Sequence, residues 1–272
     1  MSDLAVDCRI QVERAAGEVL LDLVEGGKHF TCRIDLQTGQ ANISAGGAEE
    51  VASLEPTSVS APGQYQLRFS NVDDQLLLWV DDELVSFGEQ VPGVQYDAEE
   101  IFGDRSLVLP ATSSADLGDL APVGVGARGA TFSVDRLQVL RDIYYVAVRA
   151  GQMIPQYQDY PEESLDNADG PLGHHLLFAE PASWNRFKLR KKYEFSIDAN
   201  QFFVMGDNSP ESADCRLWNM LRDGGKPGGA YLDRRMLIGK AVCVFWPHSW
   251  GSIPGLNQLP GFPNFGDMRI VR

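Results

Sequence analysis

Short stretches of alternating apolar and polar residues dominate the first half of the chain. In the stretch 30–36, every second residue is apolar and the residues between are polar, which predicts a strand with one buried and one solvated face. The same pattern, or a short apolar run, predicts strands at 8–12, 18–24, 30–36, 41–43, 65–69, 75–80, 83–87 and 131–140. Thr38-Gly39-Gln40 and Asp81-Asp82 stand where tight hairpin turns are needed. No amphipathic pattern of helix length competes, so we expect an antiparallel β-sandwich.

Charge divides the chain into two parts. The 272 residues carry a formal net charge of −15, and residues 1–150 hold 24 of the 38 acids but 10 of the 23 bases. The acidity argues against nucleic acid as a partner and against a basic face that docks on anionic lipid. A polar segment with Pro and Gly follows at 156–173. We therefore predict two domains, 1–147 and 148–272, with the boundary near residue 148.

The cysteines and histidines do not have the spacing of a metal site. Cys8, Cys32, Cys215 and Cys243 form no C-x-x-C or Cys/His pattern, and His29, His174, His175 and His248 lack acidic or thiol partners at ligand spacing. We expect neither a metal nor a cofactor. Two alternatives stay open for the first cysteine pair: a disulfide between neighbouring strands, or buried free thiols.

The segment 65–82, YQLRFSNVDDQLLLWVDD, runs as strand, polar turn, and strand ending in Trp-Val-Asp-Asp. It resembles the central hairpin of laminin-G-like or concanavalin-like jelly rolls, and residues 132–145 are similar to the last strand of that family. The resemblance implies a jelly-roll sandwich that binds glycans or proteins, in some members through Ca²⁺. The pairs Asp73-Asp74 and Asp81-Asp82 have the oxygens for such an ion, but acidic residues are also ordinary in hairpin turns. We assign no ligand site here.

The second part carries the chemistry in residues 201–218, QFFVMGDNSPESADCRLW. A short buried strand is predicted at 202–205, followed by a turn. Beyond the turn, Ser212, Asp214 and Arg216 stand at alternate positions, so an extended chain would point all three the same way. Asp214 and Arg216 can then form a charge-assisted, bidentate pair that stiffens the loop and holds the Ser212 hydroxyl in place.

The residue order 206–216, GDNSPESADCR, resembles the last signature box of the type I signal peptidases, G-D-N-x-x-x-S-x-D-S-R. Residues 237–247, LIGKAVCVFWP, are similar to the closing strand of that family, G-K-A-x-x-x-x-W. The family consists of membrane-anchored serine proteases that cut signal peptides from exported preproteins with a Ser nucleophile and a Lys base. The resemblance implies that Ser212 orients the Lys amine and that Asp214 and Arg216 form a supporting ion pair. Gly206, Asp207 and Asn208 would shape the loop.

The chain departs from the family pattern in two ways. Within the box, Cys215 replaces a Ser and Ser209 replaces a common Arg. The nucleophile box S-x-M-x-P and the Lys box are also missing: the nearest string, Gly151-Gln152-Met153-Ile154-Pro155, has Gly at the nucleophile position, and Lys192 lacks the Gly and Pro context.

These departures lead to two hypotheses. In the first, the nucleophile and the base lie upstream of this chain, and the sandwich is an insertion, as in signal peptidases of planctomycete-type bacteria. The parent would then be membrane-anchored, with its catalytic domain on the outer, periplasmic-side face, and this piece would be soluble and inactive by itself. In the second hypothesis, the chain is a non-catalytic sandwich that binds a glycan or a protein, attached to a degenerate peptidase remnant.

Overall fold

The computed structural model describes residues 3–47, 55–88, 93–104, 108–142, 179–190, 195–206, 214–216, 231–245 and 268–271. Contacts between Cα atoms divide the chain into two compact units. The first comprises Met1–Tyr193 with Ser209–Glu211, and the second comprises Glu194–Asn208 with Ser212–Arg272. The boundary predicted near residue 148 lies outside the described residues.

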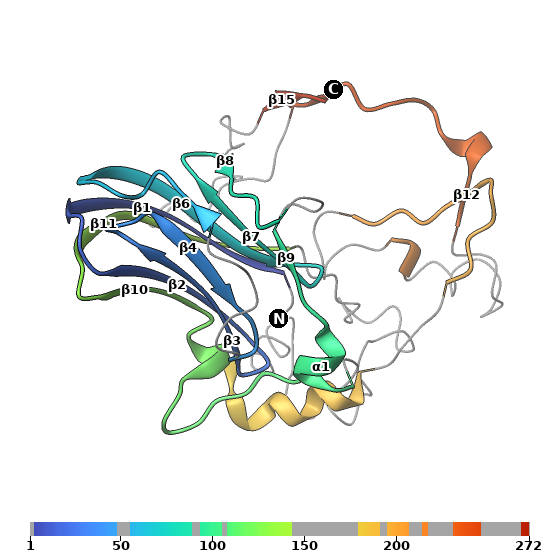
Figure 1. The fold of residues 1–272 in the computed structure, drawn as a ribbon. Helices are drawn as coiled ribbons and strands as arrows, with labels where there is room; N and C mark the ends of the chain where they lie inside the picture. Colours follow the sequence, from blue (N-terminus) through green and yellow to red (C-terminus); the bar gives the residue numbers. More distant parts are fainter. Residues whose placement is uncertain are drawn as a thin grey trace, which may run out of the picture. The chain divides into compact units, whose positions relative to one another are not determined.

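Two antiparallel sheets form the first unit (Figure 1). The six-stranded sheet has the order β11-β1-β6-β7-β8, with β9 also paired to β7, and the five-stranded sheet has the order β10-β2-β3-β4-β5. The strands of the first sheet are β1 (Leu4–Arg14), β6 (Gly63–Val72), β7 (Gln75–Val80), β8 (Glu83–Leu84), β9 (Val94–Gln95) and β11 (Thr131–Arg141). Those of the second are β2 (Glu18–Glu25), β3 (Lys28–Asp35), β4 (Gln40–Ser44), β5 (Glu55–Pro56) and β10 (Val123–Arg128). The predicted β-sandwich is confirmed.

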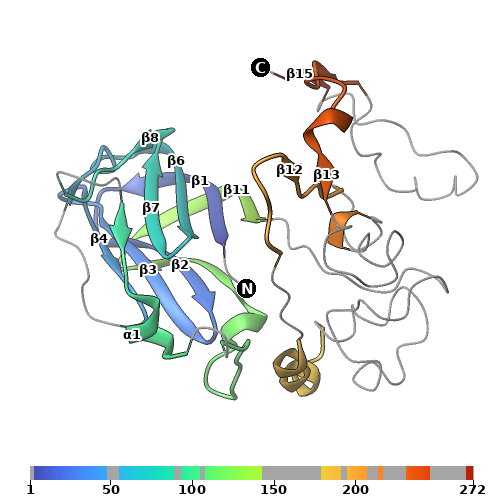
Figure 2. The same cartoon turned by 90° about the vertical axis from the view of Figure 1, so that its right-hand side faces the viewer.

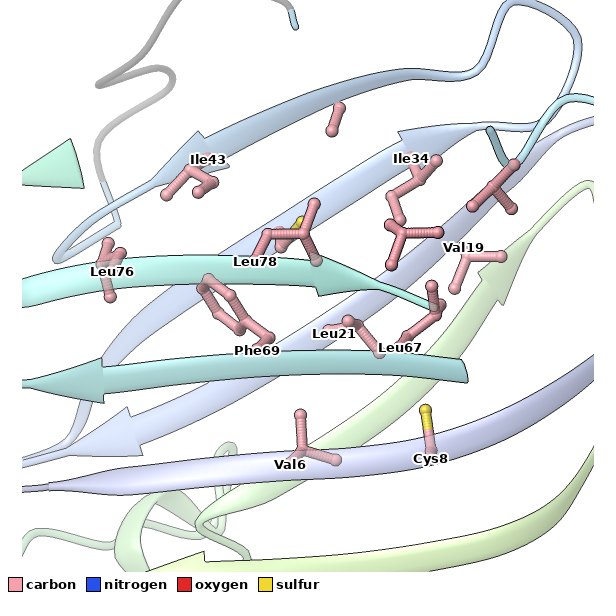
Figure 3. Close-up of a cluster of buried hydrophobic side chains, with 14 of the residues drawn as sticks. Val6, Cys8, Val19, Leu21, Ile34, Ile43, Leu67, Phe69, Leu76 and Leu78 are labelled. Atoms are coloured by element: carbon pink, nitrogen blue, oxygen red, sulfur yellow. The ribbon is translucent and has the colours of Figure 1, made fainter. Parts of the chain in front are cut away.

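The core lies between the two sheets. Along β3, residues alternate between buried and half-buried, with Phe30, Cys32 and Ile34 fully enclosed. Apolar side chains from β1, β6 and β7 point toward those from β2, β3 and β4 (Figure 3). Each enclosed Leu, Ile or Phe contributes about 1.5–3 kcal/mol through removal of apolar surface from water. The apolar positions of the alternating sequence pattern in β3 are therefore the residues that form this core.

Acidic pairs form two of the hairpin turns. Asp73 and Asp74, between β6 and β7, have φ values of 51° and 61°, and Asp81 and Asp82, between β7 and β8, have 52° and 65°. Two consecutive residues with positive φ make the type I′ turn that fits the twist of a hairpin, and Asp tolerates this conformation better than most residues. These carboxylates thus belong to the turn chemistry of the sandwich. Across the described residues, no three His, Cys, Asp or Glu side chains gather closely enough to hold a metal ion.

Several elements differ from the sequence-based prediction. β8 is shorter than the predicted strand 83–87, and β10 was not predicted because Gly124 and Gly126 lower the strand propensity of its sequence. A short helix, α1 (Ala98–Phe102), begins after Asp97, whose carboxylate accepts the backbone N–H groups of Glu99 and Glu100. A 3₁₀ turn, η2 (Gly118–Leu120), precedes β10. All four cysteines are free thiols, so the disulfide alternative for Cys8 and Cys32 is wrong.

Gly17 occupies a tight position between β1 and β2. Its φ is +76°, and a Cβ atom added there would lie 2.3 Å from the carbonyl carbon of Gly129 and 2.4 Å from the carbonyl oxygen of Arg128. The Gly17 carbonyl accepts the backbone N–H of Leu36. This glycine therefore lets the β1–β2 turn approach the β10–β11 turn closely.

His29 joins the second sheet to the segment that precedes β10. Its Nδ1 lies 2.6 Å from Asp22 Oδ2 and its Nε2 lies 2.9 Å from Asp116 Oδ2. Asp22 also accepts the Thr31 hydroxyl, and the Asp119 carboxylate accepts the backbone N–H groups of Gly26, Gly27 and Ala111. Partial burial opposes charging of the ring, but the hydrogen bonds to Asp116 and Asp22 outweigh it and raise the pKa of His29 from its ordinary value of 6.5.

We expect the stabilisation from protonated His29 to fade in alkaline solution. A raised folded-state pKa means that this contribution is complete below pH 6.5 and is lost as the pH rises through the folded pKa of His29. Because the ring is 39% exposed, the loss should be about 1 kcal/mol or less. An NMR titration of the ring should give a pKa above 6.5, and His29→Gln should remove this part of the pH dependence. A ring pKa below 6.5 would contradict the bridge.

The described strands of the second unit are short (Figure 2). β12 (Gln201–Phe202) pairs with β13 (Leu232–Asp233), which leads into the 3₁₀ turn η5 (Arg234–Met236), and β14 (Cys243–Val244) pairs with β15 (Arg269–Ile270). The predicted strand 202–205 ends at Phe202. Beyond it, the Val204 N–H donates to the Cys215 sulfur and the Gly206 N–H donates to the Asp214 carboxylate, instead of to a neighbouring strand. Of the predicted closing strand 237–247, only β14 is a strand in the described part. In the regions that the structure describes, we find no helix of sufficient length and apolarity to cross a bilayer.

Candidate functional site

The Asp214 carboxylate joins both sides of the loop predicted to carry the chemistry. Its Oδ2 accepts the backbone N–H of Gly206 at 2.9 Å, and its Oδ1 accepts the backbone N–H of Arg216 at 3.1 Å. The Arg216 guanidinium donates Nε–H to Oδ1 at 2.7 Å and Nη2–H to Oδ2 at 2.6 Å. The predicted bidentate pair is therefore present, and it also fixes the end of the segment that precedes the loop.

Cys215 provides a second link at the same place. Its backbone N–H donates to the Val204 carbonyl at 3.1 Å, and the Val204 N–H points to the Cys215 sulfur, also at 3.1 Å. The Cys215 side chain is fully enclosed, and burial raises the pKa of its thiol above the ordinary value of 9.0. The thiol is therefore neutral and serves as a weak acceptor, with no access for a substrate.

Aromatic packing holds the strand that leads into the site. The Phe203 ring lies 4.6 Å from that of Phe195 and 6.3 Å from that of Tyr231, centroid to centroid. The Arg234 guanidinium carbon lies 5.0 Å from the centre of the Phe202 ring, a cation–π distance. These contacts tie β12 and the residues after it to β13 and η5.

The ion pair is shielded from water. The side chains of Arg216 and Asp214 are 10% and 7% exposed. Burial of Asp214 favours its neutral form, but hydrogen bonds from the Arg216 side chain and from the backbone of Gly206 and Arg216 outweigh that effect and lower the pKa of Asp214 below 3.8. The carboxylate is thus ionised at neutral pH and acts as a fixed acceptor.

The structure brings together three of the predicted site residues, Gly206, Asp214 and Arg216. The other three, Asp207, Asn208 and Ser212, lie outside the described residues. In the sequence, Cys215 stands out only as a departure from the family pattern, and nothing there predicts its bonds to Val204. The signal that the sequence offers is a cysteine placed between Asp214 and Arg216 after the short apolar run 202–205.

Among the described residues of this site, Asp214, Cys215 and Arg216 are held in structural contacts. Asp214 is committed to four hydrogen bonds, and the Cys215 thiol is buried and neutral. What the geometry can do is hold Gly206 against Asp214, so that the two ends of the segment 207–213 stay adjacent. A residue of that segment would therefore lie between two anchored ends.

Comparison with known proteins identifies a relationship in this part of the chain. The family model described as "Signal peptidase, peptidase S26" matches residues 145–246. Signal peptidase I of Pseudomonas aeruginosa is 32% identical over 116 residues, a match that covers 39% of this chain and 39% of that protein. The matched region thus spans about two fifths of the length of this relative. The predicted resemblance to the C-terminal portion of type I signal peptidases is confirmed.

Solved structures with similarity to this chain include a carbohydrate-binding module and laminin domains. A carbohydrate-binding module from Bacillus subtilis is 14% identical, with 51% of this chain and 75% of that chain covered and a TM-score of 0.35. Domains LG4-5 of the mouse laminin α1 chain are 18% identical, with 52% of this chain and 36% of that chain covered and a TM-score of 0.33.

Proposed function

We propose, from the similarity of residues 145–246 to the signal peptidases, that the second part of this chain supports the catalytic dyad of a signal peptidase I. The substrates would be exported preproteins, cleaved at the end of their signal peptides. The observation that carries the proposal is the Asp214 carboxylate, which bonds to Gly206 on one side of the loop and to Arg216 on the other. These are residues of the box that the resemblance assigns to the support of the dyad.

In this proposal, the scaffold acts by positioning. Ser212 lies between Gly206 and Asp214 in the sequence. The hydrogen bond from the Gly206 N–H to the Asp214 carboxylate would therefore limit where the Ser212 hydroxyl can lie. The hydroxyl would accept a hydrogen bond from the amine of a Lys base and hold it toward the nucleophilic Ser. A Lys becomes a usable base when apolar surroundings lower its pKa, and it then needs a neutral partner such as a hydroxyl to orient it.

The nucleophile and the base are proposed to lie outside residues 1–272. The support is that the chain contains no S-x-M-x-P string and no Lys box of the family kind, whereas its last box is nearly complete. Attachment to the membrane, with the catalytic domain on the outer face, is part of the same proposal because the family is membrane-anchored.

Substitution of Ser212 tests this role. In the product of the complete coding sequence, Ser212→Ala should lower the rate of preprotein cleavage about 10²-fold, the effect of misplacing a reacting group by about 1 Å. Ser212→Thr retains the hydroxyl and should restore part of the rate. Ser209→Ala is the matched control, because it removes a hydroxyl from the same segment at a position where the family pattern is variable, and it should leave the rate unchanged.

Two results would contradict the proposal. The first is preprotein cleavage by residues 1–272 alone that Ser212→Ala abolishes, since the dyad would then be formed within this chain. The second is an equal rate for Ser212→Ala and the unaltered protein, since Ser212 would then have no part in the reaction.

A further inference from the structure

Strand β11 forms one edge of the six-stranded sheet, beside β1 (Figure 2). Its 11 residues pair with β1 on one side, and none of the other strands that the structure describes pairs with it. The outward backbone N–H and C=O groups of such an edge can pair with a further strand. The sequence of β11, TFSVDRLQVLR, contains no proline, which is one of the usual means of blocking an edge.

The side of β11 that faces the core is apolar but only partly covered. Residues directly opposite each other in an antiparallel pair have their side chains on the same face of the sheet. Leu137 lies opposite Cys8, which is fully buried in the core, and the same relation to core residues of β1 holds for Phe132, Val134 and Val139. Nevertheless, Val134, Leu137 and Val139 are 40%, 54% and 53% exposed. The sandwich therefore leaves a row of apolar side chains half uncovered along this edge.

A bulge interrupts this row at its centre. Arg136 lies opposite Arg9 and Val134 lies opposite Ile10, so Asp135 is an additional residue in β11. Because of this bulge, the apolar side chains face the core at positions 132, 134, 137 and 139 instead of at every second position. A strand that extends the sheet beyond β11 must match this irregular spacing if its own apolar side chains are to lie on the same face.

The strand β11 of a second copy, placed antiparallel, has the matching spacing. When Asp135 lies opposite Arg136 of the second copy, the two bulges lie across from each other and symmetry gives two pairs of opposite charge. In that register the apolar residues lie opposite one another: Phe132 with Val139, and Val134 with Leu137. A slip by one residue would place Asp135 opposite its own copy, or Arg136 opposite its own copy, and would set apolar against polar side chains.

We propose that this chain associates with a second copy of itself through antiparallel pairing of the two β11 strands, with Asp135 of each copy opposite Arg136 of the other. The interface lies in the first unit and goes beyond the proposed peptidase function, on which it does not depend. The net charge of −15 on each copy opposes association, so the measurements are made at physiological ionic strength, which screens this repulsion.

Sedimentation velocity of the full chain over a concentration series measures the association. In Asp135→Arg, the two copies face each other with arginines only, and in Arg136→Asp they face each other with aspartates only. Each variant alone should therefore associate at least about tenfold more weakly than the unaltered chain. An equimolar mixture of the two variants again has two pairs of opposite charge, and it should associate about as strongly as the unaltered chain.

Glu99→Arg is the matched control, because it changes the net charge as Asp135→Arg does, at an exposed position of α1. It should leave the association unchanged, and thermal unfolding of each variant checks that the sandwich is intact. Hydrogen exchange tests the interface without any substitution: amides of β11 that do not bond to β1 should gain protection as the concentration of the unaltered chain rises.

Four results would overturn the proposal. The first is an unaltered chain that stays monomeric up to about 1 mM, and the second is an absence of concentration-dependent protection in β11. The third is association of Asp135→Arg and of Arg136→Asp with the affinity of the unaltered chain, since another surface would then form the contact. The fourth is a mixture of the two variants that associates no better than either variant alone, since the two residues would then not lie opposite each other.

Discussion

Asp214→Asn is expected to lower the free energy of opening of the contacts that join Val204 and Gly206 to residues 214–216 by about 3–5 kcal/mol, the usual result of removing one partner from a buried ion pair. The substitution retains the shape of the side chain but leaves the Arg216 guanidinium, 10% exposed, without its counter-ion. It also directs an amide N–H₂ group toward donors. Amide hydrogen exchange at Gly206, Cys215 and Arg216 measures the effect, since these N–H groups are hydrogen-bonded within the site.

The second unit contains a matched control in Asp233 and Arg235. This pair has the same spacing, with Arg235 N, Nε and Nη2 at 2.9, 3.1 and 3.0 Å from the Asp233 carboxylate, but the Arg235 side chain is 88% exposed. Asp233→Asn should leave the exchange rates of the Gly206, Cys215 and Arg216 amides unchanged. Equal effects of the two substitutions would show that burial of the Asp214 pair has no part in holding the loop.

The same pair should make the site sensitive to acid. Because the pKa of Asp214 is lowered in the folded state, its contribution to stability is complete above the ordinary value of 3.8 and is lost as the pH falls through the folded pKa. In the unaltered protein, the Gly206 and Arg216 amides should therefore lose protection from hydrogen exchange as the pH falls through the folded pKa of Asp214. In Asp214→Asn, protection of these amides should not change over that pH range.

Gly17→Ala is expected to lower the free energy of unfolding of the sandwich by about 2–5 kcal/mol. About 1–2 kcal/mol follows from placing an L side chain at φ +76°, and about 1–3 kcal/mol from the overlap of its Cβ with the backbone at Gly129. The colliding atoms are main-chain atoms, so no side chain can rotate to relieve the contact. Urea unfolding followed by circular dichroism measures the change.

Gly47→Ala separates the two causes. Gly47 has a comparable φ of +85°, and a Cβ there would have no neighbour within 4 Å. Its substitution should therefore cost about 1–2 kcal/mol, the conformational contribution alone. If both variants lose the same stability, the close approach of the two turns is not a constraint on the fold.

Sequence patterns were sufficient for those parts of the fold in which one face of a strand is buried. β2, β3 and β7 begin and end within one or two residues of their predicted positions. Their sequences either alternate between apolar and polar residues or are apolar at most positions. β10 escaped prediction because Gly124 and Gly126 interrupt its pattern, and its place in the sheet is set by pairing with β2. When pairing with a neighbouring strand determines where a strand forms, its own sequence has only a weak strand pattern.

The candidate site was predictable where two charged residues interact locally. The Asp214–Arg216 pair follows from the spacing of the two residues, and the structure contains it. The contact of Asp214 with Gly206 was not predictable, since it depends on the path of the chain between them. The same holds for Cys215 and Val204, where a thiol accepts a backbone N–H that would otherwise continue a strand.

The state of the four thiols has a practical consequence for chemical labelling. Cys8, Cys32 and Cys215 are enclosed, and burial raises their pKa values, that of Cys8 to about 11, so few of them are thiolates at neutral pH. Cys243, which pairs with Ile270 of β15, is exposed. Since alkylating reagents react with accessible thiolates, a maleimide dye would attach to the folded native sequence at this one position. A fluorophore can therefore be placed in the second unit without a single substitution.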